Sequence, residues 1–219
     1  PRHSSSAASD VYKRQNFHRT NYFLILSLGA MLIGFAPIFV KWSLLSSSAI
    51  AFYRMFLTIP FLFGLNYLLN GKLKFQVKNK WTIIYAAFAS LAFTTDLTLW
   101  HYSMGITSVS NATIIVNSAP IFVAILSFIF FKEKLSKGFV ISFLVTYLGI
   151  VGLIYYSNNY INGKLLGDIL CMIAAFFYAV YLLVIARLGK ENSLNIIFYT
   201  TLFCCCLLYT SPSPRDRVQ

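Results

Sequence analysis

Long uncharged, apolar stretches alternate with short basic segments along the chain. A helix that crosses a membrane needs about 20 mainly apolar residues, because each residue rises about 1.5 Å and the hydrocarbon layer is about 30 Å thick. The stretches reach that length, so we expect six complete spans and the beginning of a seventh. The expected ranges are 20–40, 48–70, 81–100, 108–131, 138–156 and 168–186, and the seventh begins near Leu194.

These stretches are apolar on all sides rather than at every second residue, which predicts helices and not the strands of a membrane barrel. The composition agrees, since 58% of the 219 residues are hydrophobic and 11% are charged, more apolar surface than one soluble core could hide. The formal net charge is +12, but Lys and Arg lie singly or in short clusters, so nucleic acid is not an expected partner. We expect an all-α membrane protein, a polytopic helical bundle in a lipid bilayer.

The basic residues between the spans are distributed unevenly. One set of alternating loops holds ten of them and the other holds only Lys41 and Lys164. The ten are Arg19, Lys72, Lys74, Lys78, Lys80, Lys132, Lys134, Lys137, Arg187 and Lys190. Because positive residues resist translocation, the bias predicts a multi-pass protein of the cytoplasmic (inner) membrane with its N-terminus in the cytoplasm. The loops near residues 45, 104 and 160 would then face outward.

Both ends of the chain resemble translated sequencing adapter rather than natural protein. Residues 5–15 read SSAASDVYKRQ and residues 206–211 read CLLYTS, and the two segments correspond to opposite strands of one transposase adapter. We therefore expect adapter-derived tails at residues 1–15 and 206–219, the first of them disordered.

Four segments of the remaining chain carry a family resemblance. GFAPIFVKW stands in the first expected span, AFYRMFL in the second, TSVSNATIIVNSAPIFVAILSFIFFKEKLS along the fourth and GFVISFLVTYLGIVGLIYY in the fifth. Together they resemble the EamA-like branch of the drug/metabolite transporter superfamily. The resemblance is most specific over residues 107–136, where a small and polar helix start, Pro120 and a Lys-Glu-Lys turn around Glu133 follow the family pattern.

The resemblance implies ten helices arranged as two five-helix repeats, the second inverted relative to the first. Residues 16–157 would be the first EamA-like repeat with five transmembrane helices, and residues 158–205 would be the start of the second, with span six and part of span seven. A short internal echo is consistent with a repeat, because SLNIIFY at residues 193–199 resembles SSAIAFY at residues 47–53.

The function implied by the resemblance is that of a secondary transporter, an exporter or exchanger of a small polar or amphipathic metabolite. The sequence has no HExxH, GxSxG or Gly-rich phosphate loop, so we expect no enzyme, no cofactor and no metal. An intramembrane enzyme using Asp96 and His101 as acid and base would lack a nucleophile. The alternative that stays open is a membrane scaffold or sensor without transport activity, and a homodimer is also left open.

Two ionisable residues lie inside expected spans, where a charge is costly and usually faces the protein interior. Arg54 lies about 9 Å below the outer end of the second span, and Asp96 about 8 Å below the outer end of the third. The matching depths allow an Arg54–Asp96 charge pair or shared hydrogen-bond network. That network could be purely structural or could bind substrate or a proton.

Three neighbours could extend this polar level. Trp100 lies about 40° around the helix from Asp96 and can line the same face, although an aromatic anchor at the membrane interface is the alternative. His101 could titrate at the cavity mouth or be an interfacial loop residue. Lys41 at the outer end of the first span adds either a positive contact or a snorkelling side chain.

The fourth expected span is polar for a helix in lipid. Asn111 and Asn117 could offer amide groups to a cavity or could hydrogen-bond neighbouring helices. Pro120 cannot donate to the carbonyl of Val116 and should bend the helix there. Similar kinks are expected at two other prolines, Pro37 and Pro60.

These residues together predict a substrate site in the outer half of a central cavity bounded by the first four spans. Its expected polar lining comprises Arg54, Asp96, Trp100, Asn111 and Asn117, with His101 and Lys41 at its mouth. Because Arg54 and Lys41 would outweigh Asp96 in charge, a substrate bearing a carboxylate or another anionic group is favoured.

Overall fold

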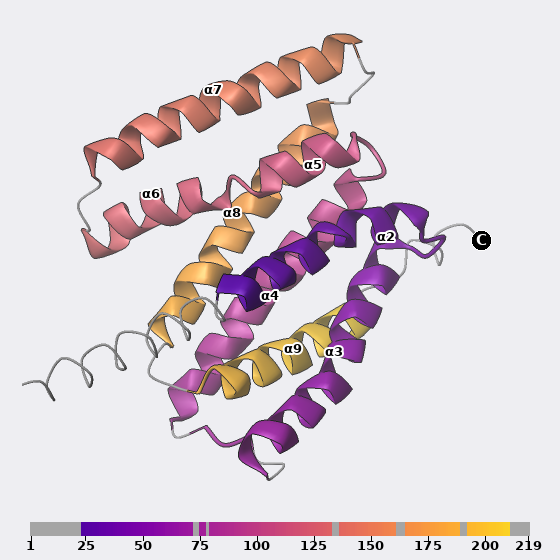
Figure 1. The fold of residues 1–219 in the computed structure, drawn as a ribbon, viewed down its shortest axis with the longest axis vertical. Helices are drawn as coiled ribbons and strands as arrows, with labels where there is room; N and C mark the ends of the chain where they lie inside the picture. Colours follow the sequence, from indigo (N-terminus) through magenta and orange to yellow (C-terminus); the bar gives the residue numbers. More distant parts are fainter. Residues whose placement is uncertain are drawn as a thin grey trace, which may run out of the picture. The chain divides into compact units, whose positions relative to one another are not determined.

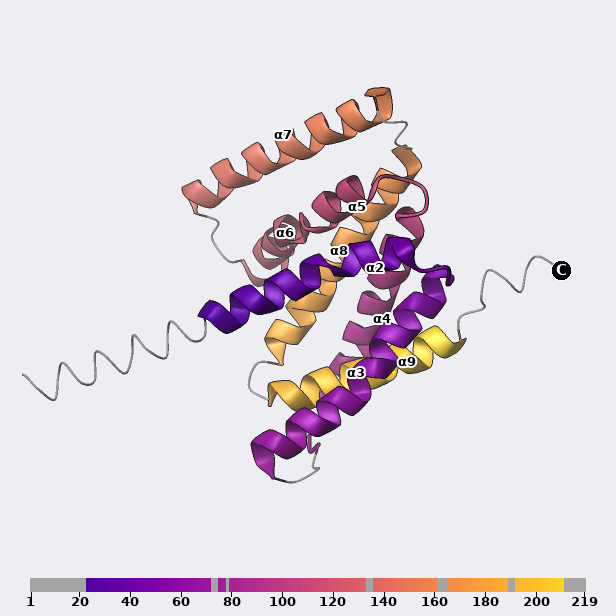
Figure 2. The ribbon, with the colours of Figure 1, turned by 45° about the vertical axis from the view of Figure 1, so that its right-hand side comes forward.

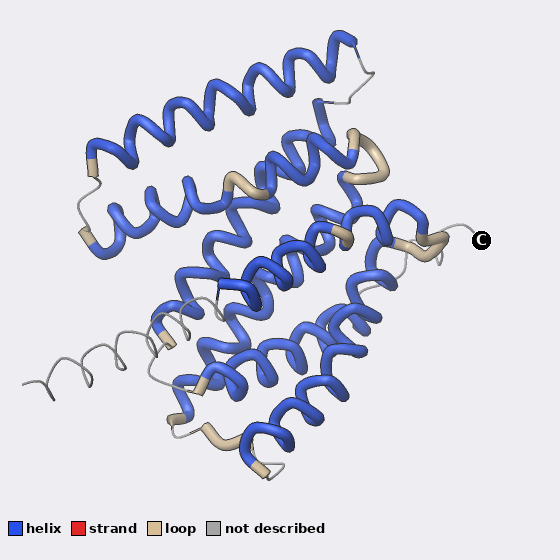
Figure 3. Tube along the Cα trace, viewed as in Figure 1, coloured by secondary structure: helices blue, strands red, loops and turns tan. Residues whose placement is uncertain are grey.

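The structure is a computed structural model, and it describes residues 23–71, 75–77, 79–132, 136–160, 165–188 and 192–210. All regular secondary structure in these ranges is helical (Figure 3). The expected tail at residues 1–15 lies outside the described residues, as does the part of the C-terminal tail beyond residue 210. The chain divides into two units, residues 1–42 and 43–219, which we describe separately.

The first unit contains one candidate membrane span, Phe23–Trp42. A turn at Phe35 interrupts it, and its second part is helix α2, Ala36–Trp42. Pro37 is the second residue of α2, a position where its missing N–H would have no helical partner in any case. The interruption therefore falls where the proline pattern predicts a kink.

The second unit consists of seven described helices (Figure 1). They are α3 Ser47–Asn70, α4 Lys80–Ser103, α5 Val109–Val116, α6 Ala119–Phe131, α7 Lys137–Tyr160, α8 Leu165–Arg187 and α9 Ser193–Thr210. Counting α5 and α6 as one span, five helical segments of the described chain are long and apolar enough to cross a membrane. The fold class is confirmed as a polytopic helical membrane protein.

Polar caps explain where several of these helices begin and end. The side chains of Ser46, Asn79 and Ser108 accept hydrogen bonds from backbone N–H groups at the starts of α3, α4 and α5. Gly71 ends α3 in the left-handed conformation, with φ of 63°, which glycine adopts without steric cost. Short polar side chains thus mark the starts of three apolar helices, and a glycine marks the end of one.

Small side chains bring α4 and α8 together, and α4 packs more extensively on α8 than on any other helix. The fully buried positions on this pair are mostly alanine, serine and cysteine. They are Ala86, Ala89, Ser90 and Ser103 on α4, and Cys171, Ala174, Ala175 and Ala179 on α8. Without a hydrophobic driving force between helices in lipid, close approach of backbones through small residues is the usual way to pack them.

Helix α9 crosses α3 and α4 on the other side of the unit (Figures 1 and 2). The hydroxyl of Ser90 donates to the carbonyl oxygen of Thr200 at 3.0 Å, which ties α4 to α9. Helix α9 continues through Thr210, five residues into the expected C-terminal tail, because Leu207, Leu208 and Tyr209 extend its apolar pattern. The origin of those residues stays a prediction.

The fourth span is broken rather than bent. Helix α5 ends at Val116 and α6 begins at Ala119, with Asn117 and Ser118 in a turn between them. The N–H of Ser118 donates to the carbonyl oxygen of Ile115, three residues earlier, and Pro120 lies in the first turn of α6. By contrast, α3 continues through Pro60 without a break. Interrupted helices are a common feature of secondary transporters.

Candidate functional site

A hydrogen bond between α3 and α4 forms the centre of the candidate site. Nη1 of Arg54 lies 3.0 Å from Nε2 of His101. The guanidinium carbon of Arg54 also lies 5.8 Å from the centre of the Trp100 ring, within the range of a cation–π contact. Arg54 therefore contacts two consecutive aromatic residues near the end of α4.

Asp96 lies one turn earlier on α4 and is only 4% exposed. Both residues lie in the described part of the chain, and no direct ion pair joins the Arg54 guanidinium to the Asp96 carboxylate. The guanidinium donates a hydrogen bond to His101 instead. The Oδ1 atom of Asp96 is buried and accepts no hydrogen bond from any described residue.

The Arg54 contact fixes the arrangement of protons on His101. A guanidinium can only donate, so Nε2 of His101 must accept, and the proton of a neutral imidazole is then on Nδ1. Nδ1 of His101 and Nε1 of Trp100 are both buried and have no partner in the described part of the chain. The cluster thus offers two free N–H donors beside one free carboxylate oxygen.

The other expected site residues are distributed elsewhere. Asn111 is buried and its amide lies 3.4 Å from Asp168 of α8. Asn117 is exposed, donates to the carbonyl of Thr113 in its own helix, and lines a separate hollow between α5 and α7 of about 460 Å³. Lys41 belongs to the first unit, where it is exposed at the end of α2.

Asp168 was not among the residues that the sequence indicated. It lies in the first turn of α8, is 1% exposed and accepts a hydrogen bond from the hydroxyl of Thr107 at 2.7 Å. Next to it, Ser103 Oγ and Cys171 Sγ lie 2.8 Å apart. A lone acidic residue at the boundary of an otherwise uncharged span was the available signal.

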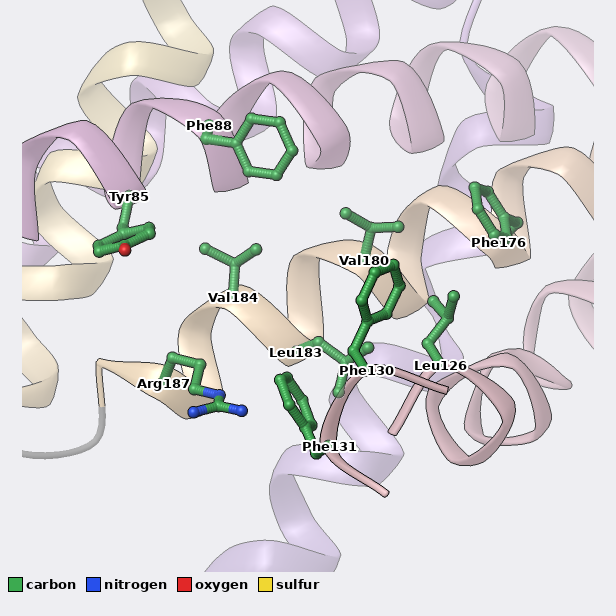
Figure 4. Close-up of a pocket in the computed structure, with 10 residues that line it drawn as sticks. All are labelled: Tyr85, Phe88, Leu126, Phe130, Phe131, Phe176, Val180, Leu183, Val184 and Arg187. Carbon is green, nitrogen blue, oxygen red and sulfur yellow. The ribbon is translucent and has the colours of Figure 1, made fainter. Parts of the chain in front are cut away.

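A large apolar groove lies toward the opposite end of the same helices, between α4, α6 and α8 (Figure 4). Its volume is about 870 Å³, within the usual range of small-molecule sites. Phenylalanine side chains from all three helices point into it, and Arg187 lies at one end beside Phe131. The guanidinium carbon of Arg187 is 3.5 Å from the centre of the Phe131 ring, so its charge is already in contact with an aromatic face.

The described residues contain no group of three or more His, Cys, Asp or Glu that could hold a metal ion. Their polar side chains form two clusters near one end of the second unit. The first joins Arg54, Trp100 and His101, with Asp96 one turn earlier on α4. The second joins Thr107, Asn111 and Asp168. Polar and ionisable groups inside apolar helices usually face the protein interior or a water-filled cavity.

Comparisons with known proteins agree with these features. Residues 20–155 match the EamA-like transporter family. An uncharacterized transporter encoded in the sor 3' region of Acidianus ambivalens is 28% identical over 137 residues, which are 62% of this chain and 53% of that protein. The chain thus spans about half the length of that curated relative, and no solved structure matches it. Because the family match covers more than half of the residues, this chain belongs to the EamA-like transporter family.

Proposed function

We propose that the protein is a secondary transporter that exports or exchanges a small polar or amphipathic metabolite across the cytoplasmic membrane. The observation that carries the proposal is that three buried polar atoms near the end of α4 have no partner, namely Asp96 Oδ1, Trp100 Nε1 and His101 Nδ1. Each such atom costs about 1–3 kcal/mol when it stays unsatisfied. A solute that pairs with them would recover this free energy.

The chemistry of the cluster favours a solute with a carboxylate or another acceptor-rich group. Trp100 and His101 supply free N–H donors, and Arg54 adds a positive charge next to them. Asp96 supplies one acceptor, which a hydroxyl or amine of the same solute would satisfy. The apolar groove of Figure 4 adds a surface on which the apolar part of an amphipathic solute could lie along its path.

The proposal is tested by transport in proteoliposomes. Candidate solutes are first screened for the ability to raise the melting temperature of the purified protein, and those that do are tested for counterflow uptake. Trp100→Phe removes the indole N–H and leaves a smaller aromatic ring, and Asp96→Asn removes the charge and nearly keeps the shape. We expect both to lower uptake by at least about tenfold, as expected for one lost buried hydrogen bond.

Tyr102→Phe is the matched control, because it removes a hydroxyl from an exposed residue in the same turn of α4. Uptake by Tyr102→Phe should equal that of the unmodified protein. If Asp96→Asn and Trp100→Phe transport as well as Tyr102→Phe, the cluster is structural and the proposed site is wrong. If no solute is taken up by the unmodified protein, a scaffold or sensor role is favoured.

A further inference from the structure

Asp168 is a buried carboxylate whose charge is only partly compensated. Its Oδ1 atom accepts hydrogen bonds from Thr107 Oγ1 at 2.7 Å and Asn111 Nδ2 at 3.4 Å. Its Oδ2 atom is buried and unpartnered, and no described Lys, Arg or His forms an ion pair with the carboxylate. One of its two oxygens therefore has no donor or cation.

The N-terminus of α8 does not remove this deficit. A helix N-terminus stabilises a nearby carboxylate by less than it costs to take that carboxylate out of water. The 3.4 Å contact to Asn111 is also long for a hydrogen bond. The remaining cost is of the size that a bound cation would offset.

The backbone next to Asp168 packs closely against Thr107. A Cβ atom added to the neighbouring Gly167 would lie 2.8 Å from Cβ of Thr107 and 3.0 Å from its backbone nitrogen. The loop after α4 and the start of α8 are thus in close contact. Thr107 and Asn111 come from one segment and Asp168 from a second, 57 to 61 residues later, and the three side chains meet at the Asp168 carboxylate.

We propose that Asp168, Thr107 and Asn111 form a binding site for a sodium ion. Carboxylate, hydroxyl and amide oxygens are ligands for hard cations, and a 180° turn of the Asn111 amide would present its oxygen. One carboxylate balances one positive charge, whereas calcium sites normally use several carboxylates. The site goes beyond the transport function proposed above and does not depend on it.

The test is the melting temperature of the purified protein in detergent as sodium chloride replaces choline chloride at constant pH and ionic strength. A ligand that binds only the folded state raises the melting temperature in a saturable way. We expect this rise for the unmodified protein and its loss in Asp168→Asn. Tyr102→Phe is the control, because it removes a hydroxyl from an exposed residue near the same end of α4 and should keep the sodium response.

Two further measurements keep the inference testable if Asp168→Asn does not fold. Thr107→Val should raise the sodium concentration for half-maximal effect by about tenfold relative to Thr107→Ser, which keeps the hydroxyl oxygen. Binding of radioactive sodium to the unmodified protein should be displaced by unlabelled sodium. The proposal is wrong if sodium and choline give the same melting temperature, if Asp168→Asn responds like the unmodified protein, or if only acidification stabilises it.

Discussion

The guanidinium of Arg54 donates a hydrogen bond of 3.0 Å to Nε2 of His101, and this contact joins α3 to α4 within the membrane. It keeps the positive charge beside the Trp100 ring and leaves Nδ1 of His101 as a free donor. His101 therefore has two separable roles, since one nitrogen positions Arg54 and the other is available to a solute.

Replacing His101 with each of the two amide residues, glutamine and asparagine, can separate these roles. His101→Gln places an acceptor near the position of Nε2, and His101→Asn places a donor near that of Nδ1. If the free donor binds the solute, His101→Asn should retain more transport than His101→Gln, while His101→Gln should retain more thermal stability. Counterflow uptake and melting temperature, measured on the same preparations, check this. Equal behaviour of the two variants would contradict the division of roles.

Gly167→Ala should destabilise the protein by about 1–3 kcal/mol, because the new methyl group has no room beside Thr107. Gly64→Ala on α3 is the control, since nothing lies within 4 Å of its added Cβ and alanine favours the helix by about 0.5–1 kcal/mol. Unfolding titrations in mixed micelles give both free energies. A stable Gly167→Ala protein would mean that α8 can move away from the loop after α4 at little cost.

Pro120→Ala should make the fourth span more continuous. Alanine restores an N–H that can donate to the Val116 carbonyl, and it removes the ring that crowds this carbonyl. We expect slower hydrogen exchange of the amides at residues 117–121. Pro60→Ala should change exchange less, because α3 is already continuous. Unchanged exchange in Pro120→Ala would mean that Asn117 and Ser118 maintain the break without the proline.

The orientation predicted by the basic loops can be tested with added cysteines. Gly105→Cys lies in the exposed turn after α4, and Lys137→Cys lies at the exposed start of α7. In a background without the native cysteines, an impermeant reagent added to intact cells should label Gly105→Cys only. Lys137→Cys should react once the inner face is opened. The reverse result would invert the topology.

The positions of the helices could be read from the sequence because the thickness of the bilayer sets the length of an apolar run. The expected span 48–70 is found as Ser47–Asn70, and the expected span 168–186 as Leu165–Arg187. The turn between α5 and α6 was less predictable. A proline indicates a weak point in a helix, but the packing around it decides whether the helix bends or breaks.

Which side chains contact one another within the site depends on how each helix is rotated about its own axis, and the sequence does not define this rotation. The sequence placed Arg54 and Asp96 at the same depth in the membrane and therefore allowed them to pair. In the structure, Arg54 instead donates its hydrogen bond to His101, which lies about 140° around α4 from Asp96. Asp168 was missed because its burial results from Thr107 and Asn111, 61 and 57 residues away in the chain. Such contacts follow from tertiary packing and not from local pattern.

The packing of α4 also bears on how the protein is made. The family match ends at residue 155, whereas the small-residue face of α4 is covered by α8 and tied to α9, both of which come later in the chain. During synthesis, α4 therefore lacks its contacts with α8 and α9 until residues beyond 165 have been translated. The segment that matches the family thus reaches the packing seen in this structure only after later helices have joined it.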